Sequence, residues 1–132
     1  MIANKSIFIK CKLYKVFDFI ENVENWPRYA IHNVKSAIKA EDGTWHIQTP
    51  RGPGKIMMRS SREIGSLEHE FIDAEGNSWL VPARVEEVEG GGTIFAVRFK
   101  KPEGMPEADF HQGTASIDEE LKILKKILEG EQ

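Results

Sequence analysis

Apolar and polar positions change their spacing along this chain, and each change marks an expected element. The short apolar stretch at 7–11 has the composition of a first strand. Apolar residues then recur every three or four positions from Leu13 to Val23, which predicts an amphipathic helix. Pro27 disfavours a helical residue ahead of it, so this helix should end before Pro27, with a second short helical turn at 26–29.

Between residues 34 and 100 the spacing of apolar residues shortens to two, which is typical of half-buried strands. Asp42-Gly43 favours a two-residue hairpin, and glycine-containing segments mark the later turns. Pro82 indicates a bulge or an edge position inside one strand. Connections this short predict an antiparallel meander. Its strands are expected at about 34–40, 44–49, 55–63, 66–73, 78–88 and 93–100.

A long final helix is predicted after a linker at 102–106, with Pro106 suited to the first helical position and Gly130 to the stop. Charged residues, including Glu119 and Glu120, are expected on its solvent face. Gly113 inside this helix costs about 1 kcal/mol relative to alanine. We interpret it as leaving room for a ligand or for close packing on the sheet; the alternative is a tolerated surface glycine. The apolar face carries Phe110, Thr114, Ile117, Leu121, Leu124 and Leu128.

Alternation along the strands puts apolar side chains on one face of the sheet and charged ones on the other. The chain should therefore form an α+β fold, with a curved antiparallel sheet of about seven strands wrapped around the C-terminal helix. Residues 1–132 are expected to form a single domain. Few elements remain to cover such a sheet, so an internal apolar cavity between sheet and helix is geometrically natural.

Composition narrows the range of partners. The net charge is −3 with 30% charged residues, and no basic stripe is present, so we expect no nucleic-acid partner. Cys11 is the only cysteine, which excludes an intrachain disulfide and favours a small buried apolar role. No apolar run is long enough to span a bilayer, and the first residues lack the apolar core of a signal peptide. We expect a cytoplasmic protein without stable membrane insertion, either a monomer or a homodimer.

His69 is the polar residue that falls on the apolar face of a central strand. A buried imidazole there could hydrogen-bond a ligand carbonyl or hydroxyl, or move a proton as a weak catalytic candidate. The alternative is a core histidine tied to a neighbouring backbone or hydroxyl group. The residues expected to line a ligand cavity are Trp26, Tyr29, Trp45, Met58, His69, Phe71, Trp79, Val81, Phe95, Val97, Phe110, Thr114 and Ile117.

Other chemistry has weaker support. The four histidines, at positions 32, 46, 69 and 111, lack metal-like local spacing, and we expect neither a metal nor a cofactor. The glycine-rich segment 51–55 lacks the Walker spacing, and a plain hairpin turn is favoured over a mobile pocket lip. No nucleophile motif is present.

Several segments together resemble the START/Bet v 1-like (SRPBCC) superfamily, and within it the branch often labelled polyketide cyclase/dehydrase. These segments are 16–27, 67–73, 81–85 and 102–105, and the resemblance spans nearly the whole chain. It implies the helix-grip fold. Members of the superfamily bind lipids, hormones, quinones or polyketides, and some catalyse reactions, so the fold does not fix the function.

Three functional hypotheses follow. The first is binding of a small hydrophobic molecule, such as a lipid, quinone or polyketide-like compound, in the internal cavity. The second is an enzyme of the cyclase or dehydratase type that acts on a hydrophobic substrate with His69 as acid or base. The third is a protein-interaction module with a filled core.

Overall fold

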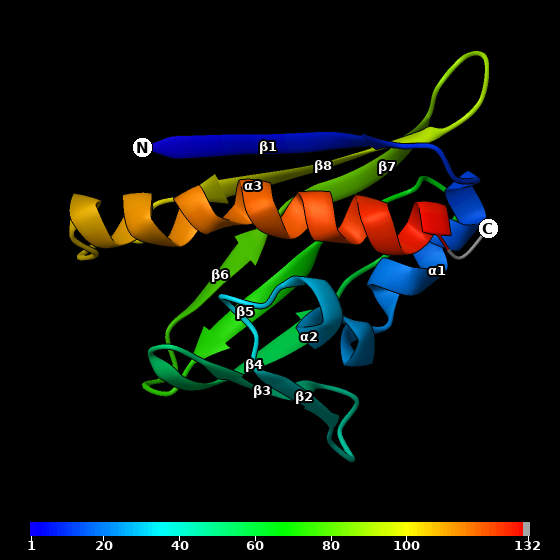
Figure 1. Cartoon of the computed structure of the whole chain (residues 1–132). Helices are drawn as coiled ribbons and strands as arrows, with labels where there is room; N and C mark the ends of the chain where they lie inside the picture. The colour runs from blue at the N-terminus through cyan, green and yellow to red at the C-terminus, as the bar shows by residue number, and fades with distance from the viewer. Residues whose placement is uncertain (131–132) are drawn as a thin grey trace.

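Two antiparallel sheets and one long helix form the framework of the molecule (Figure 1). The structure is a computed structural model that describes residues 1–130. Along the chain the elements are β1 (Ile2–Ile9), α1 (Leu13–Glu21), a 3₁₀ turn (Val23–Asn25), α2 (Trp26–Tyr29), β2 (Ser36–Lys39), β3 (Trp45–Thr49), β4 (Gly52–Met58), β5 (His69–Asp73), β6 (Ser78–Val81), β7 (Ala83–Glu87), β8 (Thr93–Lys100) and α3 (Glu107–Gly130).

The strands divide into a three-stranded sheet in the order β1-β8-β7 and a five-stranded sheet in the order β2-β3-β4-β5-β6. The division falls at Pro82, inside the strand predicted over 78–88, because proline has no N–H to donate to a neighbouring strand. The Pro82 carbonyl still accepts from the Arg98 amide at 2.9 Å, and the Leu67 amide donates to the Ala83 carbonyl at 2.8 Å. These bonds join the two sheets.

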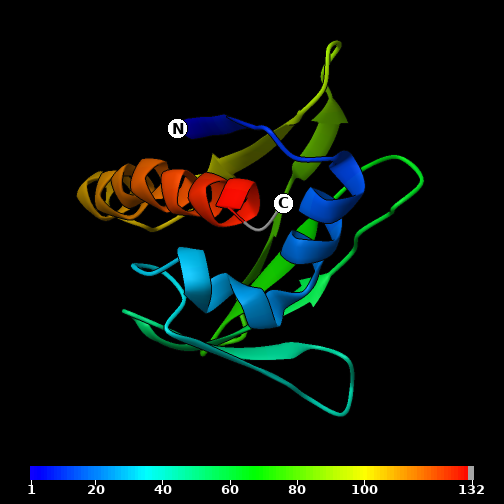
Figure 2. The same cartoon turned by 45° about the vertical axis from the view of Figure 1, so that its right-hand side comes forward.

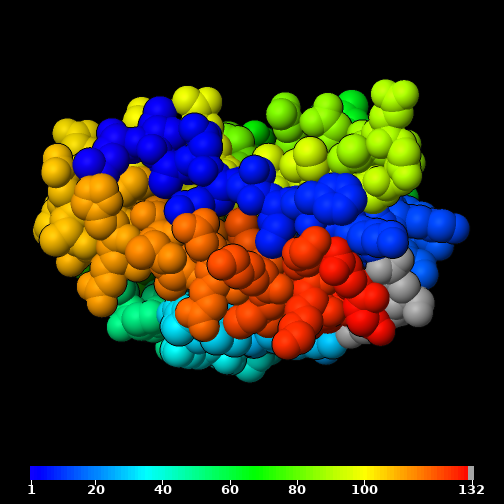
Figure 3. Space-filling model, turned by 45° about the horizontal axis from the view of Figure 1, so that its top comes forward, coloured from blue at the N-terminus to red at the C-terminus, as the bar shows by residue number. Residues whose placement is uncertain are grey.

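Helix α3 lies across the open side of the sheets and makes its main contacts with β1 and α2. Figure 2 shows α3 together with α1 and α2 on that side, and Figure 3 shows β1 and α3 next to each other on one face. Leu121, Leu124 and Leu128 of α3 are buried, as the apolar spacing predicts. This arrangement, antiparallel sheets wrapped on a long C-terminal helix, confirms the predicted α+β helix-grip class.

The predicted one-sidedness of the strands is also confirmed. On the inner face, His69 lies opposite Met58 and Val81 on the neighbouring strands. Outward-facing Arg84 and Arg98 are exposed. The hydrophobic core includes side chains from both sheets and from α1, α2 and α3.

Several element boundaries differ from the prediction. The first strand covers residues 2–9 instead of 7–11, because its polar half pairs fully with β8. The segment 51–55 is mostly strand: Pro50 and Arg51 turn, and Gly52 begins β4. Pairing of β4 with β5 begins only at Gly54, so Pro53 has no hydrogen bond to β5 to lose.

The strands predicted over 55–63 and 66–73 are shorter, and residues 59–68 connect them. Helix α3 begins one residue after Pro106, whose carbonyl accepts from the amides of Asp109 and Phe110.

Candidate functional site

The inner face of β4–β6 contains both buried side chains, Ile56 and Val81, and side chains that the core covers only in part. Met58, His69, Phe71 and Trp79 point inward but are only half-buried. In the three-stranded sheet, inward Phe95 and Val97 are buried, whereas inward Ile7 and Phe99 are half-buried. Helix α3 packs mainly on β1 and α2. We call the region around Met58, His69, Phe71, Trp79 and the facing Trp26 of α2 the inner-face site.

The His69 imidazole has a defined tautomer. Its Nδ1 lies 3.1 Å from the Leu67 carbonyl oxygen, which can only accept, so Nδ1 carries the hydrogen and Nε2 carries a lone pair. Within residues 1–130, Nε2 has no hydrogen-bond partner. No side-chain nitrogen or oxygen of that part of the chain is both fully buried and unpartnered. Nε2 is therefore an acceptor that solvent can reach.

The surroundings of His69 keep its ring neutral. Burial lowers the pKa of His69 from 6.5 to about 4, against a smaller raising effect of the Leu67 hydrogen bond. Apolar Met58 and Val81 flank it, and the Trp26 ring meets it edge-on with centroids 5.0 Å apart. The orienting partner of the imidazole is a backbone carbonyl, not a carboxylate, so His69 is a weak base at neutral pH.

Gly113 faces open space on the inward side of α3. It is half-buried and lies one turn from both Phe110 and Ile117 on the same helix face. A Cβ atom added to Gly113 would find no heavy atom within 4 Å outside its neighbours and its own helix backbone. Of the two predicted consequences of this glycine, close packing on the sheet is therefore wrong. Room for a ligand and a tolerated surface glycine both agree with this open space, and both stay predictions.

Tyr29 of α2 is buried close to a carboxylate. Burial, with a smaller effect from the negative charge of Glu120, raises the pKa of Tyr29 far above its usual value of 10. Its hydroxyl therefore stays protonated. This places an uncharged phenol on the same short helix as Trp26.

Glu120 does not lie on the solvent face of α3, as the sequence predicted, but is only 2% exposed. Its Oε2 accepts from the amides of His32 at 2.7 Å and Asn33 at 3.1 Å. Its Oε1 accepts from Asn33 Nδ2 at 2.9 Å. The carboxylate thus fastens the segment after α2 to α3. Its position at the third residue after Ile117, on the apolar stripe, is the signal in the sequence that could have revealed this.

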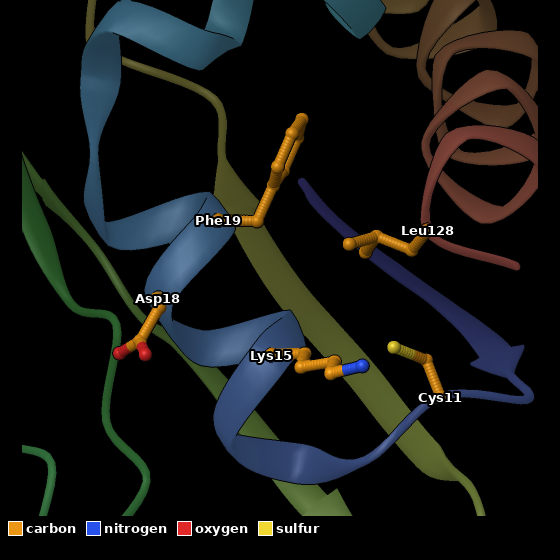
Figure 4. A pocket seen from close by; sticks show the side chains of 5 residues that line it. All are labelled: Cys11, Lys15, Asp18, Phe19 and Leu128. Atoms are coloured by element: carbon orange, nitrogen blue, oxygen red, sulfur yellow. The ribbon is translucent and has the colours of Figure 1, made fainter. Parts of the chain in front are cut away.

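Among the hollows on the surface of residues 1–130 are two next to apolar side chains. One, of about 350 Å³, lies between α1 and the end of α3 and is lined by Cys11, Lys15, Asp18, Phe19 and Leu128 (Figure 4). The other, of about 410 Å³, is lined by Trp79, Leu80, Lys100, Lys101, Pro102 and Glu103. Neither was predicted. Trp79 also contacts Phe71, with ring centroids 5.0 Å apart, so the second hollow adjoins the inner-face site.

The structure gathers only part of the predicted lining. Trp26, Met58, His69, Phe71 and Trp79 form the inner-face site described above. Phe95 and Val97 are buried in the core at the three-stranded sheet, and Val81 and Phe110 are also buried. Trp45, Thr114 and Ile117 are half-buried. The hydroxyl of Thr114 donates to the Phe110 carbonyl at 2.9 Å and is therefore occupied within α3.

No group of three or more His, Cys, Asp or Glu side chains within residues 1–130 is placed to hold a metal ion. No helix in the same part of the chain is long and apolar enough to cross a membrane.

Comparison with known proteins shows the fold. No family model and no curated protein matches the chain. The protein XoxI from Bacillus cereus superposes with a TM-score of 0.73 at 16% identity, over 96% of this chain and 94% of that one. An uncharacterized protein from Bacillus thuringiensis gives 0.74 at 16% identity, over 97% and 98%. A START superfamily protein from Mycobacterium smegmatis gives 0.65 at 11% identity, over 99% of both chains. The predicted START-like helix-grip fold is confirmed, and the chain has that fold.

Proposed function

We propose that this protein binds a small hydrophobic molecule at the inner-face site, between the sheet and the Gly113 turn of α3. The observation that carries the proposal is the open space beside Gly113 on an inward helix face. On the inner face of the sheet, Met58, Phe71 and Trp79 remain half-buried. Inward apolar surface that the protein's own core does not cover is what a hydrophobic ligand would bury.

The energetics favour such an occupant. Each Å² of apolar surface removed from water contributes roughly 25 cal/mol, and an aromatic wall offers a large area at low conformational cost. Small-molecule sites combine such walls with a few polar groups, and here His69 supplies one. The START-like fold agrees with this function, since members of that superfamily bind hydrophobic ligands. A lipid, quinone or polyketide-like compound is the class of ligand that we propose.

The test fills the space beside Gly113. N-phenyl-1-naphthylamine, a neutral apolar fluorophore, would be titrated into the wild type, Gly113→Phe and Ala115→Phe. Ala115 is exposed on the opposite side of the same helix turn and provides the matched control. We expect Gly113→Phe to weaken probe binding at least tenfold while its circular dichroism and melting temperature are retained. Ala115→Phe should bind like the wild type.

The wild type, purified without detergent, would also be analysed by native mass spectrometry and organic extraction. A stoichiometric apolar molecule that is lost in Gly113→Phe would support the proposal and identify the ligand. Equal binding by all three proteins would contradict the site. A clean apo mass together with no probe binding would contradict the function and favour an interaction module.

A further inference from the structure

We infer that the inner-face site selects uncharged apolar molecules that carry a hydroxyl group, with this hydroxyl donating to Nε2 of His69. The inference rests on the proposed binding function and names its ligand class. It is narrower than the expectation from sequence, which allowed either a ligand carbonyl or a ligand hydroxyl. The geometry around the imidazole distinguishes the two.

The tautomer of His69 is set by the backbone at the junction of the sheets. Nδ1 must donate to the Leu67 carbonyl, 3.1 Å away. Leu67 cannot easily move, because it is 1% exposed and its amide donates to the carbonyl of Ala83 in β7 at 2.8 Å. Turning the imidazole into the other tautomer would aim a lone pair at the carbonyl oxygen. Nε2 is thereby kept as an acceptor and requires a donor from the ligand.

A ligand carbonyl finds no matching donor from the aromatic ring beside His69. The indole N–H of Trp26, the ring that touches His69, is already committed to the Ile20 carbonyl at 2.7 Å. A ketone in place of the hydroxyl would therefore set two acceptors against each other. It would also leave Nε2 desolvated without a partner, which is penalised in a buried site.

An anionic ligand is disfavoured for a separate reason. The residues that lie opposite His69 on both neighbouring strands, Met58 and Val81, are apolar. The ring itself is neutral at neutral pH, in agreement with its pKa of about 4. A carboxylate placed there would lose its hydration without gaining a cation. A hydroxyl loses far less hydration free energy and gains a hydrogen bond to Nε2 of His69.

The test uses four naphthalenes that differ only at position 2. They are 2-naphthol, its isostere 2-methylnaphthalene, 2-acetylnaphthalene as an acceptor without a donor, and 2-naphthoate as an anion. Dissociation constants would be measured for the wild type, His69→Phe and Gly113→Phe. An apolar wall alone would prefer the methyl group over the hydroxyl, so the order of affinities reports on the hydrogen bond.

We expect 2-naphthol to bind the wild type about tenfold more tightly than 2-methylnaphthalene, with 2-acetylnaphthalene and 2-naphthoate weaker still. In His69→Phe the hydroxyl preference should disappear while 2-methylnaphthalene binds as before. In ¹⁵N NMR spectra of the wild type, 2-naphthol should shift the Nε2 resonance of His69 and leave Nδ1 protonated.

Equal affinity for 2-naphthol and 2-methylnaphthalene, or a preference for the ketone or the anion, would overturn the inference. The binding function would then stand alone, provided that Gly113→Phe still abolishes binding. If none of the four compounds binds the wild type, both the inference and the proposed function are overturned.

Discussion

The indole of Trp26 meets the imidazole of His69 edge-on, with ring centroids 5.0 Å apart and planes inclined at 71°. The same indole donates its N–H to the Ile20 carbonyl at 2.7 Å. Helix α2 has only four residues and could not persist alone, since isolated helices need about 12 residues or more. Trp26 supplies the missing support by joining α1 on one side and β5 on the other, which fixes α2 above the inner-face site.

We predict that Trp26→Phe destabilises the protein by about 2 kcal/mol, because the buried Ile20 carbonyl loses its donor and the ring loses contact area. Urea unfolding, followed by circular dichroism, would measure the change. Tyr14→Phe is a suitable control, because Tyr14 is exposed and its change should be nearly neutral. A loss below about 0.5 kcal/mol for Trp26→Phe would show that the indole is not an anchor.

His69 should make stability depend on pH between about 6.5 and 4. Its pKa falls from 6.5 in the unfolded chain to about 4 in the folded protein, because burial disfavours the charged ring. In this window the unfolded state binds more protons, so stability decreases as the pH is lowered. The stability lost on lowering the pH through this window is at most about 3 kcal/mol, and none of it is lost above pH 6.5.

The measurement is the free energy of unfolding at several pH values in the wild type and in His69→Phe. The wild type should lose more stability than the variant between pH 7 and pH 4. Parallel curves for the two proteins would mean that the imidazole titrates normally and is not desolvated. Carboxylates that titrate in the same range cancel in this comparison, because both proteins contain them.

The sequence predicted the faces of the strands better than it predicted their ends. Alternation is a local property, so it placed His69 and Phe71 on the inner face without knowledge of any partner. Strand ends depend on pairing. Gly52 and Pro53 extend β4 because β3 lies beside them, and only the three-dimensional structure shows that neighbour.

Glu120 shows where prediction of the site failed. A glutamate in a helix is usually exposed, and the position of Glu120 on the apolar stripe after Ile117 was the one local signal against that expectation. Its donors, the amides of His32 and Asn33, lie 88 and 87 positions away along the chain. The surface hollows likewise depend on side chains from distant segments. Such features require the packed structure, whereas the apolar side chains of the inner-face site followed from spacing alone.

Replacing Glu120 by alanine should destabilise the protein by about 3 kcal/mol, because two buried amides and the Asn33 side chain lose a charged acceptor. The neighbouring Glu119 is a matched control. Its carboxylate lies 2.9 Å from the His32 ring in an exposed pair, and such pairs contribute little. Chemical denaturation of Glu120→Ala and Glu119→Ala would compare them, and equal losses would contradict the buried clamp.

The same clamp should hold α2 over the inner-face site. In Glu120→Ala, amide hydrogen exchange in residues 26–34 should therefore increase more than exchange in β8. Uniform acceleration across the chain would instead indicate a general loss of stability without a specific release of α2.

Two glycines should respond in opposite ways to alanine, and the pair tests the open space beside α3. Gly113→Ala should stabilise the protein by about 0.5–1 kcal/mol, because the helix gains a better helix former and the new methyl group meets nothing within 4 Å. Gly65→Ala should destabilise it by about 2 kcal/mol or more. Gly65 has a φ of +71°, and a Cβ there would lie 2.7 Å from the Val85 carbonyl oxygen, a backbone atom that cannot swing aside. Melting temperatures of both variants would measure the contrast. A destabilised Gly113→Ala would mean that the space is filled, which would remove the main support for a ligand site between α3 and the sheet.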